Sequence, residues 1–319
     1  MRILFIGYSS VAKRRILPFL NQIQSIEAVD IAKFDTQRNE NIESFDLIGQ
    51  VFDSYKVALE KSQAEIAYIS NVNSAHAFWT ENALKRRMHV IVDKPAFLDL
   101  KTALEMTTLA EKLDLCLAEA TVYSYHPQIS KVIEIIHENN LSPANLTINF
   151  SFPPMIYGNF RYSKDLGGGA FNDLGPYAVS PGRIFFNAIP EKILCSINDY
   201  DNMKNVELSF SVIAKYSNGR SMTGNFGFTT EYINRLNILG PDFLFEINRV
   251  FTPPVDSENE ILFKMKNKSN LIRTGKSNSF INFIRDFIDS VNTHDYLKFR
   301  SQLIMDAKAV ELLKKNILS

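Results

Sequence analysis

The chain opens with MRILFIGYSSVA (residues 1–12), and this stretch decides the fold. Ile3 to Ile6 form a continuous apolar run, which is typical of a strand buried on both faces of a parallel sheet. Gly7 follows at once and allows a sharp turn, and Val11 to Gln22 then carry apolar residues along one side, as an amphipathic helix does. A buried strand, a tight turn and a helix predict the opening of a doubly wound α/β fold.

The same alternation continues to about residue 120. Further strands are expected at residues 26–32, 47–51, 67–69, 89–92 and 115–120, and helices at 55–63, 75–85 and 100–113. Strands that alternate with helices in this way predict a parallel sheet with helices on both faces. We therefore assign residues 1–120 to a first domain.

The pattern changes in residues 121–319, which form the second expected domain. A helix at 128–139 is followed by strands at 145–152, 192–198, 206–216, 221–229, 235–240 and 243–249, and the chain closes with helices at 280–292 and 299–315. Turns such as Asn218-Gly219 favour hairpins, so this domain is expected to contain a mainly antiparallel sheet. Residues 253–279 are polar and resemble a surface loop, with one short strand at 261–265. The closing helices can pack back on the first domain.

Composition excludes several classes of protein. The 319 residues suffice for two domains, and 35 basic residues balance 35 acidic ones. A net charge of zero does not fit a nucleic-acid-binding surface and offers no attraction to an acidic membrane. Cys116 and Cys195 lie in apolar runs and are expected to be buried thiols, and no spacing of ligands predicts a metal. No apolar run suits a signal peptide or a membrane span, so the cytoplasm is the expected compartment.

The turn after the first strand points to a phosphate-binding site. A helix that begins after such a turn presents free N–H groups and a partial positive charge, which suit a pyrophosphate. The pattern G-x-G-x-x-G is degraded here, because Ser9 and Ala12 replace its second and third glycines. Small residues still permit close approach, although an ordinary strand-to-helix turn would also fit. The candidate cofactor contacts are Gly7, Tyr8, Ser9, Ser10 and Val11.

The end of the second strand gives mixed signals about the cofactor. An acidic residue there accepts a hydrogen bond from the ribose of NAD, whereas a basic residue pairs with the 2′-phosphate of NADP. Lys33 favours NADP and Asp35 favours NAD. Arg14 and Arg15, on the first helix, could also reach a 2′-phosphate. The balance leans slightly towards NADP.

Lys94 is the first candidate for chemistry. It follows a central strand in Val92-Asp93-Lys94-Pro95, and ligands of open α/β sheets bind at the carboxyl ends of the strands. An ammonium group there can hold a ribose hydroxyl and donate to a carbonyl oxygen. The alternative is a structural ion pair.

A second cluster surrounds a glycine-rich segment. Gly167 to Gly169 suggest a backbone packed against a ligand or another backbone, and Asp173 and Tyr177 then share one face of a helix. Gly175 between them suggests close packing, since it weakens a helix by about 1 kcal/mol. A neighbouring ammonium would lower the tyrosine pKa from about 10 and make the phenol a better proton donor. Alternatively, Tyr177 is a packed ring with its hydroxyl at the rim.

Taken together, these segments resemble the glucose–fructose oxidoreductase / inositol dehydrogenase family. The order and spacing of the matches carry the resemblance, which runs along most of the chain. They are residues 7–12, Asn73-Ser74-Ala75-His76, Asp93-Lys94-Pro95, Tyr125-His126-Pro127-Gln128 and residues 167–177. The segments Arg14-Arg15-x-Leu17-Pro18, His126-Pro127-Gln128 and Arg249-x-Phe251-Thr252-Pro253-Pro254 are similar to the branch that contains nucleotide-linked sugar ketoreductases.

The resemblance implies a Rossmann domain followed by an open-faced sheet domain, and a dimer or tetramer formed through the outer face of that sheet. It implies that Lys94 contacts nicotinamide and substrate, and that Tyr177 takes the catalytic position with Asp173 as its partner. This chain departs from the family in Asp93, where glutamate is usual, and in Tyr177, where histidine is commoner. Further cofactor contacts are expected at Asn71, Asn73, His76 and Asp93, and substrate contacts at Tyr125, His126, Asn159 and Arg161.

Reduction of a keto-sugar, carried on a nucleotide diphosphate, is the leading hypothesis. Tyr177 would deliver the proton while Lys94 stabilises the oxyanion. Oxidation of a free polyol or sugar, as in inositol or glucose dehydrogenases, is the second. A non-catalytic dinucleotide-binding regulator is the third, although such a protein would be expected to lose the lysine or the proton donor.

Overall fold

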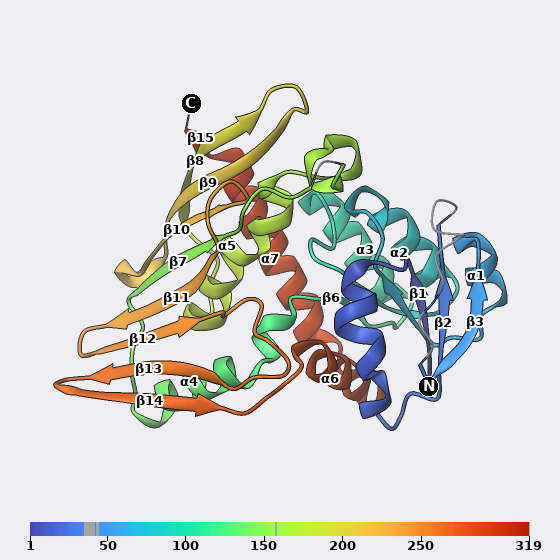
Figure 1. The fold of residues 1–319 in the computed structure, drawn as a ribbon, viewed down its shortest axis with the longest axis horizontal. Coiled ribbons are helices and arrows are strands. Elements are labelled where there is room, and N and C mark those ends of the chain that lie inside the picture. The colour runs from blue at the N-terminus through green and yellow to red at the C-terminus, as the bar shows by residue number, and fades with distance from the viewer. Residues whose placement is uncertain (35–41, 43–44, 157, 319) are drawn as a thin grey trace. The chain divides into compact units, whose positions relative to one another are not determined.

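The computed structural model describes residues 1–34, 42, 45–156 and 158–318, which fold into two compact units (Figure 1). Unit 1 comprises Met1–Thr121 and Phe280–Ile304, and unit 2 comprises Val122–Ser279 and Met305–Ser319. Each unit has its own sheet. In the described part of the chain, no helix is both long enough and apolar enough to span a membrane.

Unit 1 is built on a six-stranded parallel sheet in the order β3-β2-β1-β4-β5-β6. The buried runs seen in the sequence form its centre, where β1 and β4 are almost wholly enclosed. This order confirms the predicted doubly wound fold, with its switch point between β1 and β4. The strands are β1 (Arg2–Ile6), β2 (Ala28–Ala32), β3 (Ile48–Phe52), β4 (Ile66–Ile69), β5 (His89–Val92) and β6 (Leu117–Glu119). The helices are α1 (Tyr55–Lys61), α2 (His76–Lys85), α3 (Leu100–Lys112), α6 (Ser279–Thr293) and the first part of α7 (Leu297–Lys315).

The first helix is less regular than the sequence predicted. Instead of one α-helix over residues 11–22, a π-helical turn at Ala12–Ile16 is followed by a 3₁₀ helix at Leu17–Gln22. Pro18 explains the change, because it lacks an N–H group and its ring clashes with the preceding helical turn.

Unit 2 contains a nine-stranded sheet in the order β14-β13-β12-β11-β7-β10-β9-β8-β15. The pairing is antiparallel except between β7 and β10 and between β8 and β15, so the prediction of a mainly antiparallel sheet is confirmed. Helix α5 (Ala170–Phe186) packs on β7, β9 and β10, and α4 (Pro127–Glu138) packs near β13 and β14 (Figure 1). The strands are β7 (Asn145–Ser151), β8 (Lys192–Asp201), β9 (Val206–Lys215), β10 (Ser221–Gly227), β11 (Ile233–Gly240), β12 (Phe243–Asn248), β13 (Asn259–Met265), β14 (Lys268–Thr274) and β15 (Ile317–Leu318).

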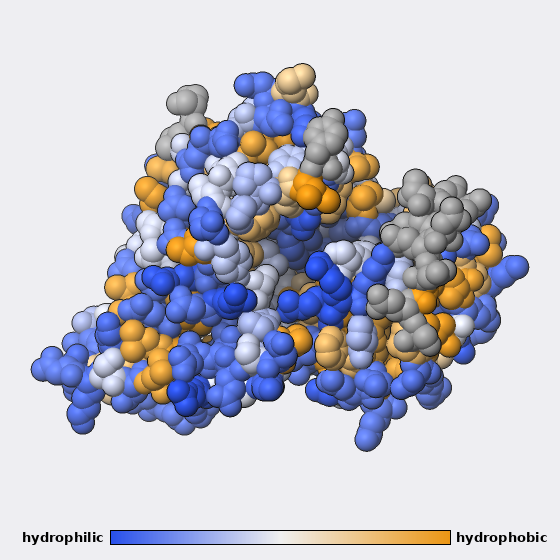
Figure 2. Space-filling model, viewed as in Figure 1, coloured by the Kyte–Doolittle hydropathy of each residue, from blue (hydrophilic) through white to orange (hydrophobic). Residues whose placement is uncertain are grey.

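The segment expected to be a loop, residues 253–279, is largely a hairpin. Its two strands are β13 and β14, and the second was not predicted. Because β14 is an edge strand that is exposed along most of its length, it lacks the alternation of apolar and polar residues that marks a half-buried strand. Figure 2 shows mostly hydrophilic residues in this region, at the lower left, with scattered hydrophobic ones.

Candidate active site

Gly7 lies at the switch point of the unit 1 sheet, directly after β1. Its backbone φ is +111°, in the region that favours glycine. A Cβ atom here would lie 2.4 Å from the carbonyl oxygen of Ser70 and 3.0 Å from the backbone nitrogen of Asn71. The turn after β1 and the loop after β4 therefore pack backbone against backbone, which leaves no room for a larger residue.

Asn71 carries an unusual pair of polar atoms. Both its side-chain oxygen and its side-chain nitrogen are shielded from solvent, and within the described chain neither has a hydrogen-bond partner. Leaving such groups unpaired costs about 1–3 kcal/mol, so a ligand that supplies partners would be stabilising. The glycine turn and this amide lie where doubly wound folds bind dinucleotides, and both fit an NAD(P) molecule.

The other residues of this turn that were predicted to contact the cofactor differ in their exposure and hydrogen bonds. Tyr8 is buried beneath the Lys13 ammonium, which lies 4.4 Å from the ring centroid. Ser10 is exposed, and its hydroxyl and carbonyl oxygens accept hydrogen bonds from Arg14 at 2.9 and 3.2 Å. Val11 starts the first helical turn.

Three basic residues were expected to be able to bind a 2′-phosphate. The first, Lys33, lies directly after β2. Its side chain is largely buried, and Nζ lies 3.9 Å from Oδ1 of Asp53. Arg14 folds back on Ser10, and the guanidinium of Arg15 lies 5.9 Å from the Phe280 ring centroid. Asp35, the residue that favoured NAD, lies outside the described residues.

Lys94 follows β5 and is partly buried. The preceding residue, Asp93, accepts hydrogen bonds from the hydroxyls of Tyr68 at 2.8 Å and Ser70 at 2.6 Å. Desolvation raises the pKa of the Asp93 carboxyl, and these two bonds and the charges of His76 and Lys94 oppose the rise. Each Asp93 oxygen therefore has a donor within unit 1.

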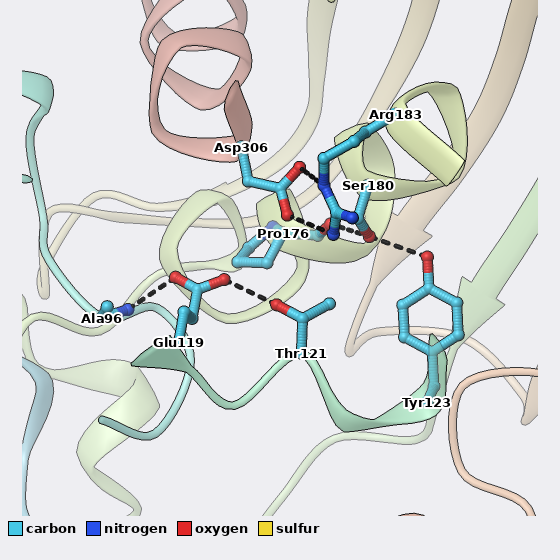
Figure 3. A network of polar contacts seen from close by, with 8 residues as sticks. All are labelled: Ala96, Glu119, Thr121, Tyr123, Pro176, Ser180, Arg183 and Asp306. Carbon is cyan, nitrogen blue, oxygen red and sulfur yellow. Dashed lines mark hydrogen bonds and ion pairs between the residues drawn. The ribbon is translucent and has the colours of Figure 1, made fainter. Parts of the chain in front are cut away.

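The residues after Lys94 are also held in place. The carbonyl oxygen of Pro95 lies 2.9 Å from Nδ1 of His76, and the N–H of Ala96 donates to Glu119 at 2.8 Å (Figure 3). The second Glu119 oxygen accepts a bond from the Thr121 hydroxyl at 2.7 Å. Glu119 was not predicted from the sequence. Its position at the end of β6, the strand beside β5, is the sequence feature that could have identified it.

His76, predicted as a cofactor contact, has a fully buried side chain. Its ring nitrogens face two backbone carbonyls, those of Pro95 at 2.9 Å and Asn71 at 3.2 Å. Burial lowers the pKa of His76, while the Asp93 carboxylate and the carbonyls favour the proton. His76 thus joins the loops after β4 and β5. Asn73, also predicted as a contact, is buried at the start of the 3₁₀ turn before α2.

In unit 2, packing against other protein groups explains the glycines before α5. A Cβ atom on Gly168 would lie 2.5 Å from the carbonyl oxygen of Arg161, and one on Gly169 would lie 2.5 Å from the carboxylate of Glu207. That carboxylate accepts the N–H of Phe171 at 2.8 Å, in the first turn of the helix, where a negative charge is favourable.

The prediction that Gly175 serves close packing is wrong. A Cβ atom at this position would meet the methyl groups of Val310 at 3.8 and 3.9 Å, which is ordinary van der Waals contact. Nothing in the described neighbourhood sterically requires glycine there.

Asp173 forms an ion pair with Arg161. Oδ2 of the aspartate lies 2.7 Å from Nε of the arginine, and the aspartate side chain is almost wholly buried. Burial lowers the pKa of Arg161, but the charge of Asp173, its hydrogen bond and the charge of Tyr177 together outweigh burial, and the net shift is upward. Asn159 accepts the N–H of Arg161 at 3.1 Å and so shapes the turn that presents the guanidinium.

Tyr177 is held through its ring. Phe150, Phe251 and Tyr123 surround it, with centroid distances of 5.1, 4.9 and 6.0 Å. Contacts of this kind contribute about 0.5–1.5 kcal/mol each beyond simple burial and restrict rotation of the ring. The ring of Tyr177 is therefore packed, which was the alternative to a role as proton donor. The two roles are compatible, because the packing also keeps the phenol in one place.

The helix that carries Tyr177 is anchored on its inner side. Ser180 donates to the carbonyl oxygen of Pro176 at 2.6 Å, so the bond of 2.8 Å between Ser180 and Tyr123 has the phenol as its donor (Figure 3). Arg183 forms a two-bond ion pair with Asp306 of α7, with both distances 2.8 Å. These contacts join α5 to the segment after β6 and to the end of the chain.

His126, predicted to line the substrate site, has a fully buried side chain. Nδ1 accepts the N–H of Gln128 at 3.2 Å and caps α4, while Nε2 lies 3.4 Å from the amide of Asn259. Tyr125, which precedes it, is partly buried at the end of a 3₁₀ turn.

The parallel sheet with its glycine turn and the sheet domain with its fixed tyrosine define a two-domain, dinucleotide-dependent oxidoreductase. Two family models match: "Oxidoreductase family, NAD-binding Rossmann fold" over residues 1–121, and "GFO/IDH/MocA C-terminal domain" over residues 134–242. The chain belongs to the GFO/IDH/MocA oxidoreductase family, as the sequence predicted.

Several enzymes are similar to this protein over most of its chain. A dTDP-3,4-didehydro-2,6-dideoxy-α-D-glucose 3-reductase from Actinomadura kijaniata is 26% identical over 91% of this chain and 87% of its own. D-xylose 1-dehydrogenase (NADP(+)) 2 from Haloferax volcanii is 25% identical over 81% and 79%. A 3-ketoreductase from Actinomadura kijaniata, solved with NADP and TDP-benzene, has the same fold, with a TM-score of 0.90, 24% identity and coverage of 99% and 98%.

Proposed function

We propose that this protein reduces a keto group of a nucleotide-linked sugar with NADPH. Its relatives include several reductases of dTDP-linked keto-sugars, and the solved 3-ketoreductase holds NADP and a TDP compound. The observation that carries the proposal is the packing of Tyr177, whose ring is held by three other aromatic rings. The same helix bears Asp173, which forms an ion pair with Arg161.

Residues of unit 1 would hold the cofactor. The backbone of Gly7 to Val11 would bind the pyrophosphate, and the amide of Asn71 would find its missing partners there. Lys33, at the end of β2, would pair with a 2′-phosphate and so favour NADP. When bound, reduced NADP supplies a hydride.

Tyr177 acts as the proton donor. A neutral phenol has a proton to give and can take one up again after turnover. Packing by Phe150 and Phe251 limits the ring to few orientations, which reduces the entropy lost on reaching the reactive geometry.

Lys94 stabilises the developing oxyanion. A single positioned donor of this kind contributes about 3 kcal/mol to the transition state. The hydrogen bonds that hold Asp93, Pro95 and Ala96 keep the backbone on both sides of the lysine in place.

Asp173 and Arg161 support the tyrosine from the same unit. Asp173 lies four residues before Tyr177 on α5, and the arginine fixes its carboxylate. Arg161, Asn159 and Tyr125 line the substrate side, and the guanidinium offers a cation to an anionic group of the substrate.

A sugar dehydrogenase is the second candidate, because a D-xylose 1-dehydrogenase is among the relatives. The reaction would then run as an oxidation, with Tyr177 accepting the proton. A regulator that binds the dinucleotide without turnover is the third. The presence of both Lys94 and Tyr177 favours an enzyme.

Substitution of the two reactive groups tests the proposal. Tyr177→Phe keeps the ring packing and should lower turnover of a dTDP-linked keto-sugar by about 100-fold or more, with NADPH affinity unchanged. Lys94→Ala should lower turnover by a similar factor. Near-normal turnover in either variant would contradict the mechanism, and NADPH binding by the wild type without turnover on any keto-sugar would favour the regulator.

We also propose that the protein acts in the cytoplasm as a homodimer or homotetramer formed through the outer face of the unit 2 sheet. Analytical ultracentrifugation, with a charge introduced at an exposed position of β10 by Thr223→Lys, would test the assembly.

A further inference from the structure

A chain of hydrogen bonds links the turn after β1 to the residue before Lys94. The N–H of Ala12 donates to Oγ of Ser9 at 3.0 Å, Ser9 and Ser70 share a bond of 2.7 Å between their hydroxyls, and Ser70 donates to Asp93 at 2.6 Å. The chain crosses the ends of three neighbouring strands, β1, β4 and β5.

The direction of each bond follows from the last one. Ser70 gives its only hydroxyl proton to the Asp93 carboxylate, so it must accept the proton of Ser9. Ser9 in turn uses a lone pair for the N–H of Ala12. The hydroxyl proton of Ser9 is therefore committed within the protein and is not the group that a phosphate meets at this turn.

Ser9 replaces the second glycine of the dinucleotide-binding pattern, so this turn carries a side chain that can tie it to a neighbouring loop, which glycine could not do. The bond to Ser70 makes this tie, since it joins the Ser9 hydroxyl to the loop after β4. That loop is itself in contact with Gly7, on the other side of the same turn.

We propose that Ser70 and Asp93 are positioning residues that hold the phosphate-binding turn in its ligand-ready shape through the side chain of Ser9. Asp93, at the position where a cofactor ligand was expected, acts through the protein and not by touching the cofactor. The inference concerns binding of the dinucleotide, so it does not depend on which sugar the enzyme reduces.

The chain supplies a matched control. Ser62 donates to Oδ2 of Asp30 at 2.7 Å, so unit 1 contains a second buried serine-to-aspartate bond of nearly the same length. This bond lies towards the amino ends of the strands, where Arg2 also pairs with Asp30. Ser62→Ala should therefore cost stability as Ser70→Ala does, without a change at the turn.

The test is the dissociation constant of NADPH for the full chain without sugar, read from the emission of Trp79, the single tryptophan, and from calorimetry. Ser70→Ala should raise the constant on the order of tenfold, the worth of one hydrogen bond of this kind, and Ser62→Ala should leave it unchanged. Ser9→Ala should raise the dissociation constant as much as Ser70→Ala does. The double variant should bind NADPH no more weakly than either single variant, because the same Ser9–Ser70 bond is lost in all three.

Unchanged NADPH affinity in Ser9→Ala and Ser70→Ala would overturn the proposal, as would equal weakening in Ser62→Ala or additive effects in the double variant. If Ser70→Ala does not fold, Ser9→Ala decides alone, since Ser9 is only partly buried. Failure of the wild type to bind NADPH would count against the cofactor assignment and would appear before any variant is compared.

Discussion

His126 makes the stability of unit 2 depend on pH. Burial lowers its pKa to about 4 from an ordinary value near 6.5. In the unfolded chain the ring takes up a proton as the pH falls through about 6.5, whereas in the folded protein it does so only near 4. Acidification therefore favours the unfolded state, and the stability present at neutral pH is lost progressively below about pH 6.5.

His126→Asn separates this titration from the helix cap, because asparagine also caps helices well. In denaturant unfolding, the wild type should lose about 2 kcal/mol more than the variant between about pH 7 and about pH 5. Burial also lowers the pKa of His76 and His89, so both proteins keep a common pH dependence. The same loss in both proteins would contradict a role for His126.

The places of single residues in the fold were predictable where a residue lies next to a clear strand or within a clear helix. Lys94 directly follows a central strand, and Asp173 and Tyr177 lie one helical turn apart, so the sequence could mark all three. Glu119 and Ser70 were missed because their partners lie 23 residues away on neighbouring strands. The burial of His126 and His76 was not predicted, since a buried imidazole paired with backbone groups has no distinct sequence pattern.

At the level of elements, the turn after β1 depends on one residue. Gly7→Ala adds a Cβ atom 2.4 Å from the carbonyl oxygen of Ser70, at a φ of +111°. The turn must shift, so NADPH affinity should fall by about tenfold or more and the free energy of unfolding by about 1–3 kcal/mol. Calorimetric titration and denaturant unfolding would measure both. Wild-type affinity in this variant would show that the turn does not bind the dinucleotide.

Helices α5 and α7 are joined by the ion pair between Arg183 and Asp306, of which both side chains are almost wholly buried. Asp306→Ala leaves a buried guanidinium without its counter-charge and should lower the free energy of unfolding by about 3–5 kcal/mol. Arg183→Met combined with Asp306→Leu should recover part of this loss. A destabilisation below about 1 kcal/mol in Asp306→Ala would mean that solvent reaches the pair.

Elements with a strong periodic pattern were predicted well, and two others were not. The helix over residues 11–22 has apolar residues in helical spacing, but Pro18 divides it into a π turn and a 3₁₀ helix. Strand β14 was read as loop, because an exposed edge strand has no buried face to leave a pattern.

For the whole molecule, local patterns together with the family resemblance sufficed to predict both sheets. Contacts between distant parts of the chain could not be predicted. Arg183 and Asp306 are 123 residues apart, and Gln128 bonds to the carbonyl oxygen of Val250 across 122 residues. Such pairs leave no mark in composition or periodicity, and they hold the helix that bears Tyr177 and the helix that follows His126.

The central claim is keto-sugar reduction with NADPH, and isotope transfer tests it most directly. The enzyme would be mixed with NADPH carrying deuterium at the transferable position and with a dTDP-linked 3-keto sugar, and the product analysed by NMR and mass spectrometry. We predict one deuterium on the new carbinol carbon in the wild type, and at least 100-fold slower labelling in Tyr177→Phe. Bound NADPH that keeps its deuterium across a panel of keto-sugars would contradict the account.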